Sequence, residues 1–260
     1  MKKIFYVTAF GLLLVSCGGQ SDTTTPVHDS IPADSGVVAV PNIAIDINAL
    51  LAKYTIRSKT PFIQDSTYFE KQGMIESSAL SGDEVKYLSY NFIENDMAYS
   101  GKSTIEDVLF FDSLKTNDAY EQYVEVLDIG MMRDANAYAA EKITLDDSTD
   151  LLLWYVDFGT YEACPYFAGQ NLYASVFRNN EVRSCTLIGE MSGGGDAPYW
   201  SETMTLFSVS NGEMLAVKTD RNGGDEDEAG NEIMTESEAI YFLEIINGNW
   251  VVTAKNETGI

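Results

Sequence analysis

The chain has 260 residues, of which 45% are hydrophobic and 12% aromatic. This length and composition allow a sizeable buried core and exclude an intrinsically disordered chain. Acidic residues dominate the charge, with 40 Asp and Glu against 16 Lys and Arg and a formal net charge of -24. Because such a charge repels phosphate backbones, nucleic acid is excluded as a general partner, and a charge-steered partner is expected to be basic.

The first 16 residues have the features of a secretory signal peptide. Lys2 and Lys3 precede an apolar run, residues 4–15, that is too short to span a bilayer. The run ends in Leu14-Val15-Ser16-Cys17, which resembles the lipobox of bacterial lipoproteins. The resemblance covers residues 1–17 only. It implies cleavage before Cys17 and attachment of fatty acyl chains such as palmitate to that residue.

The same resemblance implies where the protein resides. Several acyl chains on one cysteine hold a protein stably at a membrane without crossing it. Gly18 stands where an aspartate retains lipoproteins in the inner membrane, so the resemblance implies a lipid anchor in the cell envelope, with the outer membrane favoured. Residues 17–41 are rich in Gly, Ser, Thr, Asp and Pro, which is typical of a flexible tether behind the anchor.

The only histidine, His28, falls in this tether. A structured imidazole is therefore not expected, which argues against Ser-His-Asp hydrolysis, Cys-His proteolysis and histidine-rich metal sites. We nominate no catalytic residue. Among the many carboxylates, Asp157 and Glu162 are the least surface-like, and their expected role is to cap strand ends.

Helix signals occupy the part between residues 42 and about 130. Residues 46–54 form a short candidate helix, and Ser81-Gly82-Asp83-Glu84 is a capping box before Val85, Leu88 and Phe92 at helical spacing. A second box, residues 103–106, precedes another apolar series. Residues 120–143 are ambiguous because Gly130 interrupts a helical pattern.

From about residue 131 the pattern favours strands joined by short turns. Residues 151–158 are apolar on nearly both faces, which predicts a central strand covered on both sides. Hairpins are expected at Asn179-Asn180, Asn211-Gly212 and Asn247-Gly248. The last of these predicts that Ile245 faces Trp250, Leu243 faces Val252 and Tyr241 faces Ala254.

These elements predict one globular α+β domain, residues 42–260. In it, short N-terminal helices precede a C-terminal antiparallel β-meander that forms a sandwich or a partly closed barrel. Beyond residues 1–17 we recognise no domain family.

Three groups of residues are candidates for special roles. Cys164 and Cys185 are the two thiols left if Cys17 is acylated, and outside the reducing cytosol they form a candidate disulfide, with two inert buried thiols as the alternative. An acidic stretch contains candidate calcium ligands, although it matches an EF-hand loop at only two positions and a solvated loop between strands is the favoured alternative. Its candidate ligands are Asp220, Asn222, Asp225 and Asp227.

The third group is aromatic and surrounds a glycine-rich loop expected at residues 192–200. Tyr161, Tyr166, Tyr199 and Trp200 form a candidate platform for a sugar or a peptide, and the alternative is that they are buried under the loop.

The leading functional hypothesis is a lipid-anchored, non-catalytic binding or protein-interaction module, with a basic protein or a glycan as partner and no cofactor. The alternatives are an envelope hydrolase that acts on carbohydrate with paired carboxylates and a calcium-stabilised structural lipoprotein.

Overall fold

The structure is a computed structural model that describes residues 44–57, 61–64, 68, 78–97, 101–115, 132–161, 166–227 and 229–259. All of them belong to one compact unit, Ala39–Ile260. The signal peptide, Cys17 and the expected tether lie outside the described residues, so the predictions made for them stay predictions.

Three helices are described in the N-terminal part. They are α1 (Ile47–Ala52), α3 (Gly82–Leu88) and α4 (Gly101–Lys115). Asp46 caps α1 by accepting from the backbone N–H groups of Asn48 and Ala49. Ser81 and Glu84 form the predicted capping box at the start of α3. The helices expected at residues 46–54 and after Ser81 are thus confirmed, and α4 confirms that a helix carries the apolar series near residues 103–106.

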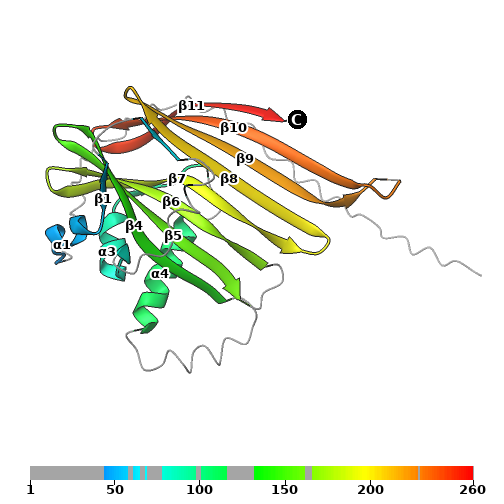
Figure 1. Ribbon diagram of the computed structural model, residues 1–260, viewed down its shortest axis with the longest axis horizontal. Helices are drawn as coiled ribbons and strands as arrows, with labels where there is room; N and C mark the ends of the chain where they lie inside the picture. Colours follow the sequence, from blue (N-terminus) through cyan, green and yellow to red (C-terminus); the bar gives the residue numbers. More distant parts are fainter. Residues whose placement is uncertain are drawn as a thin grey trace, which may run out of the picture. The chain divides into compact units, whose positions relative to one another are not determined.

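The rest of the fold is mainly one large mixed sheet (Figure 1). Its path runs β1-β4-β5-β6-β7-β8-β9-β10-β11, with β2 paired to β8 and β3 to β7. Consecutive strands from β4 to β11 pair antiparallel, as the predicted meander requires, whereas β1 and β3 pair parallel with β4 and β7. The strands are β1 (Thr55–Arg57), β2 (Phe62–Ile63), β3 (Phe92–Ile93), β4 (Met132–Asp146), β5 (Thr149–Tyr161), β6 (Tyr166–Arg178), β7 (Glu181–Asp196), β8 (Tyr199–Ser210), β9 (Glu213–Glu226), β10 (Glu232–Ile246) and β11 (Asn249–Gly259).

The sheet is not closed into a barrel, and strands make up far more of the described chain than helices do. The α+β expectation therefore holds only in its coarser form, as a β-rich fold with a few short helices.

Asparagines build the hairpin turns. Asn179, Asn180, Asn211 and Asn247 all have positive φ, and glycine follows the last two. These backbone angles fit the tight turns that join twisted antiparallel strands. All three predicted hairpins are confirmed.

Strand β5 is covered on both faces, as predicted. Its residues Leu151–Val156 are all at most 2% exposed and alternate between two buried clusters. On one face Leu152, Trp154 and Val156 pack with residues of α1, α3 and α4. Helices α3 and α4 lie together beside this part of the sheet in Figure 1.

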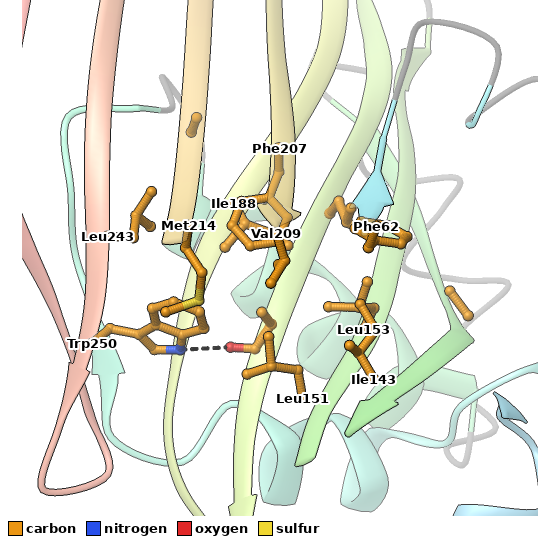
Figure 2. Packing of buried hydrophobic residues seen from close by; sticks show 14 of the residues in the cluster. Phe62, Ile143, Leu151, Leu153, Ile188, Phe207, Val209, Met214, Leu243 and Trp250 are labelled. Carbon is orange, nitrogen blue, oxygen red and sulfur yellow. Dashed lines mark hydrogen bonds between the residues drawn. The ribbon is translucent and has the colours of Figure 1, made fainter. Parts of the chain in front are cut away.

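On the other face, Leu151 and Leu153 pack with residues of the C-terminal strands (Figure 2). Phe207, Met214 and Leu243 belong to this cluster, and Trp250 Nε1 donates to the Ala174 carbonyl oxygen at 3.0 Å. That bond joins β11 to β6, which are far apart in the strand order.

Strands β7 and β8 diverge after residue pair Glu190 and Thr205, and the chain's N-terminal part fills the resulting fork. Phe62 and Ile63 pair with β8, and Phe92 and Ile93 pair with β7. Gln64 is fully buried beside β8, where its Nε2 donates to the Thr205 carbonyl at 3.3 Å and its Oε1 accepts from the Phe207 N–H at 3.2 Å. The Gln64 backbone N–H donates to the Phe207 carbonyl at 2.8 Å. Gln64 thus supplies β8 with the bonds that β7 no longer offers.

Several local predictions are wrong, and each error has a structural cause. Phe92 leaves the predicted helical face because α3 ends at Leu88 and Asn91 takes a positive φ before β3. The box at residues 103–106 lies inside α4, which begins earlier, at Gly101. Residues 192–195, expected in a loop, are paired with both β6 and β8, and Asp196 is paired with β8. Residues 220–226, expected in an acidic loop, belong to β9, and all of them except Gly224 are paired with β8 or β10.

The register predicted for the last hairpin is correct near its turn and wrong by one residue farther from it. Ile245 faces Trp250 and Leu243 faces Val252, as predicted. A bulge next to Phe242 then places Lys255, and not Ala254, opposite Tyr241.

None of the helices in the described part of the chain is both long enough and apolar enough to cross a bilayer.

Candidate functional site: a groove across strands β5 to β8

An open groove of about 620 Å³ lies on the face of β5–β8 that carries Met191. It is lined by Asp157 of β5, residues 168–170 of β6, residues 191–194 of β7 and residues 200–202 of β8. The name "groove" below refers to this set. Its volume falls within the range of about 300–1,000 Å³ that is usual for small-molecule sites.

The floor of the groove is nearly free of side chains. Ala168, Gly193 and Glu202 lie opposite one another on three neighbouring strands, so two of the three positions in that row have no side chain beyond Cβ. A Cβ added at Gly193 would lie 3.0 Å from the Ser201 carbonyl oxygen. The hollow therefore results from small residues at facing positions of adjacent strands, which allows a ligand to approach the backbone closely.

Trp200 forms the wall at one end of the groove, and its indole is held in place on two sides. Gly223 lies opposite Trp200 on β9, and a Cβ at Gly223 would lie 2.5 Å from Cε2 and Nε1 of the indole. The ring therefore rests on the glycine backbone. Its Nε1 donates to Glu232 Oε1 at 2.8 Å. Of the three tryptophans, Trp154 and Trp250 are buried, and Trp200 alone is partly exposed.

The predicted aromatic platform is partly assembled. Tyr166 and Trp200 both lie opposite Gly195, one on each side of β7, so they share a face of the sheet. Tyr166 is 54% exposed. Tyr199 is 59% exposed, but because side chains alternate along a strand it points to the opposite face from Trp200. Tyr161 ends β5, and its side chain lies outside the described residues.

Acidic groups dominate the groove. Asp157 and Glu202 line it, and among the residues that line it in the described structure there is no lysine, arginine or histidine. The nearest described cation to Glu202 is Arg221, whose Nη1 lies 3.9 Å from Glu202 Oε2. Arg221 also donates from Nε to Glu236 Oε2 at 2.8 Å, and this hydrogen bond raises the pKa of the guanidinium. The arginine is thus engaged by two carboxylates beside the groove.

Gln170 adds an uncharged polar group. It lines the groove between Asp157 and Met191, its neighbours in the register. Its side-chain Oε1 is shielded from solvent and accepts no hydrogen bond in the structure. An acceptor left in this state is costly unless a ligand donates to it.

The two carboxylates of the groove lie on strands that are not neighbours. Asp157 is on β5 and Glu202 on β8, three strand spacings apart, or roughly 14 Å along the sheet. Glycoside hydrolysis by paired carboxylates requires about 5–10 Å between the carboxyl groups. This arrangement does not favour the hydrolase alternative at the groove. Glu162 lies outside the described residues.

The candidate disulfide stays a prediction because Cys164 lies outside the described residues. Cys185 is fully buried with a free thiol, and burial raises its pKa to about 12, partly offset by hydrogen bonding with Ser175 and Trp154. The strand register places Ser175 opposite Cys185, whereas hairpin counting predicts Ala174. The difference arises from a bulge between Val176 and Phe177.

Two of the four candidate calcium ligands, Asp220 and Asp227, have other partners in the structure. Asp220 accepts from Thr203 Oγ1 at 2.7 Å and pairs with Lys218 at 3.0 Å. The Asn231 side-chain amide donates to Asp227 at 2.9 Å, and this bond, together with those from the backbone N–H groups of Asn231 and Ala229, holds the pKa of Asp227 below its usual range. Asn222 and Asp225 are in β9. In the part of the chain that the structure describes, no three His, Cys, Asp or Glu side chains gather as a metal site requires.

Sequence reasoning missed Gln170, Met191 and Glu202 as groove residues. They come from three different strands, and only the pairing of β6, β7 and β8 brings them together. The available signal was the pair Gly193-Gly194, because glycine within a strand often marks a close backbone approach.

Two smaller hollows of about 430 and 420 Å³ lie among the hairpin turns at the other end of the strands. Turn residues such as Asp146, Asn180 and Gly248 line them.

Comparisons of the chain with protein-family models, curated proteins and solved structures find no match, which agrees with the absence of a recognisable domain family in the sequence beyond residues 1–17.

Proposed function

We propose that this chain is a lipid-anchored lipoprotein of the cell envelope whose folded part is a non-catalytic ligand-binding module, with the ligand held in the groove. The lipobox resemblance at residues 14–17 supports the anchor, and Gly18, in place of a retaining aspartate, supports the outer membrane as its location. Binding without catalysis is favoured because the only histidine, His28, falls in the expected tether and the two carboxylates of the groove are on strands that are not neighbours.

The observation that carries the proposal is the side-chain-poor floor between Trp200 and Asp157. Large contiguous hollows on a sheet are normally filled by the side chains of the strands themselves. Here Ala168, Gly193 and Gly194 leave the sheet backbone accessible, and an aromatic ring and polar groups stand at the margins. A few fixed polar groups around an accessible surface are typical of ligand sites.

Filling the groove tests this proposal. Ala168→Trp places a large side chain on the floor, and Glu213→Trp adds the same side chain at an exposed position at the start of β9. The lipidated full chain, purified in detergent, would be immobilised and exposed to protein, peptide and glycan fractions of envelope extracts, with bound material measured by mass.

We expect saturable binding by the wild type and by Glu213→Trp, and its loss in Ala168→Trp. Equal binding by Ala168→Trp and the wild type would refute the groove as the site. Conversion of the bound material into smaller products by the wild type would refute a non-catalytic role.

A further inference from the structure

We propose that the ligand of the groove is a neutral or amino-sugar glycan, with one sugar ring stacked on the indole of Trp200. This inference rests on the proposed function and names its ligand class. Three features of the groove support it: the fixed indole, the excess of hydrogen-bond acceptors and the sign of the charge.

The indole is prepared for stacking before any ligand arrives. The Nε1–Cε2 edge of the ring lies against Gly223, and the bond from Nε1 to Glu232 fixes its rotation. A flat ring held along one edge in this way can present a face as a rigid apolar surface, and little conformational entropy is lost on binding. The C–H face of a pyranose matches such a surface, with its hydroxyl groups directed outward to polar partners.

Those polar partners mainly accept hydrogen bonds. Asp157 and Glu202 are acceptors when ionised, and Gln170 Oε1 lacks a donor in the structure. A ligand that fits must therefore be rich in donors, as the hydroxyl groups of a sugar or the ammonium group of an amino sugar are.

An extended peptide suits the groove less well. The backbones of β6, β7 and β8 pair with one another along the floor, from Ala168 opposite Gly193 to Gly193 opposite Glu202. No sheet edge opens into this floor, so a peptide cannot add as a further strand and satisfy its own backbone groups there.

The charge excludes anionic sugars. Asp157 and Glu202 face the groove in a chain of net charge -24, and Arg221 beside it is engaged by Glu202 and Glu236. A uronic acid or a sulfated sugar would bring like charge to these carboxylates, and none of the described residues that line the groove is a cation that could receive it.

The test uses the full chain in detergent and native gels cast with one polysaccharide each: neutral xylan or mannan, the amino-sugar polymer chitosan, and anionic polygalacturonate. We expect at least one neutral or amino polysaccharide to retard the protein and polygalacturonate to leave its mobility unchanged. Oligosaccharides of the retarding polymer should change the fluorescence of Trp200, the one partly exposed tryptophan.

Three variants locate the site. Trp200→Ala should weaken binding roughly tenfold or more, because the stacking surface is lost. Gly223→Ala keeps the indole but forces it off the strand, and should weaken binding as well. Tyr199→Ala removes the neighbouring aromatic on the opposite face and should bind as the wild type does. Near-ultraviolet circular dichroism from the buried Trp154 and Trp250 confirms that each variant is folded.

Several results would overturn the inference. If the polysaccharide still retards the Trp200→Ala variant, the groove is not the glycan site. If polygalacturonate alone retards the wild type, the ligand is anionic and the inference about its charge is wrong. If no polysaccharide binds while Ala168→Trp loses a protein or peptide ligand, the glycan inference fails and the proposed function stands. If Ala168→Trp loses nothing, the proposed function itself fails.

Discussion

Replacement of Gln64 by alanine should destabilise the fold more than the loss of a single polar side chain usually does. Gln64 is fully buried, and its amide group is the partner of the Phe207 N–H and the Thr205 carbonyl in the fork between β7 and β8. Alanine would leave both backbone groups without these bonds, in residues that are themselves fully buried. At about 1–3 kcal/mol for each unsatisfied buried group, the loss should be about 2–6 kcal/mol of unfolding free energy.

Urea unfolding followed by the fluorescence of the buried tryptophans measures this loss. With a slope of about 2–3 kcal/mol per molar urea, the midpoint should fall by on the order of 1 M. Gln170→Ala is the matched control, because it removes the same side chain from a partly exposed position where Oε1 has no partner. A loss for Gln64→Ala below about 1 kcal/mol, or equal to that of Gln170→Ala, would refute the reasoning.

A double-mutant cycle with Gly189 sharpens the test. A Cβ at Gly189 would lie 2.3 Å from Gln64 Oε1, so Gly189→Ala should be strongly destabilising in the wild type. In the Gln64→Ala background the obstructing atoms are gone, and the same substitution should cost much less. Additive losses would show that Gln64 does not occupy the fork as described.

Other predictions follow from burial, charge and the lipobox. The thiol of Cys185 should resist alkylation at pH 8 in the reduced, folded protein and react once the protein is unfolded, because burial raises its pKa to about 12; mass spectrometry of the labelled peptide checks this. Burial also raises the pKa of Glu141, with Arg57 opposing the shift, so the folded state binds the proton more tightly than the unfolded state and stability falls as the pH rises through the raised pKa. Glu141→Gln should therefore gain stability relative to the wild type at neutral pH, and the gain should shrink as the pH falls through that pKa in parallel urea titrations. Cys17→Ser should abolish incorporation of a palmitate analogue and release the protein from the membrane fraction without a change in its melting temperature. Millimolar calcium should leave the melting temperature unchanged, since Asp220 and Asp227 already have partners within the fold; a calcium-dependent rise would restore the structural-lipoprotein alternative.

The sequence reveals most of the fold wherever a local signal decides the structure. The capping box at Ser81 and the turn at Asn211-Gly212 act within a few residues, and the apolar run of β5 reports burial on both faces directly. These features were therefore predictable from one chain.

Features decided by pairing with distant strands were not predictable. Residues 193–195 and 220–226 have the composition of loops. Strands on both sides hold the three glycines in extended structure, and pairing with β8, β10 or both does the same for most of residues 220–226. In β9 the cross-strand pair of Arg221 with Glu236 adds a stabilising contact that linear spacing does not show. Bulges shift the register around Cys185 and Tyr241 by one residue, and nothing in the local pattern marks them.

For the same reason, only part of the candidate site could be predicted from the sequence. Aromatic residues near a glycine-rich segment can be recognised from the sequence, so Tyr166 and Trp200 could be named as candidate ligand-binding residues. That Gly223 supports the indole, and that Gln170 lies across the groove from it, depends on which strands are neighbours.

The fork between β7 and β8 also constrains the order in which parts of the protein can fold during synthesis. Phe62 and Gln64 are translated roughly 140 to 150 residues before their partners Val209 and Thr205. Until β8 has been synthesised and has separated from β7, these early residues have no place to bind, whereas each hairpin of the meander can form as soon as its own two strands exist. Residues 62–64 are therefore translated early but reach their final positions late, and the fork can be filled only after β8 has been synthesised.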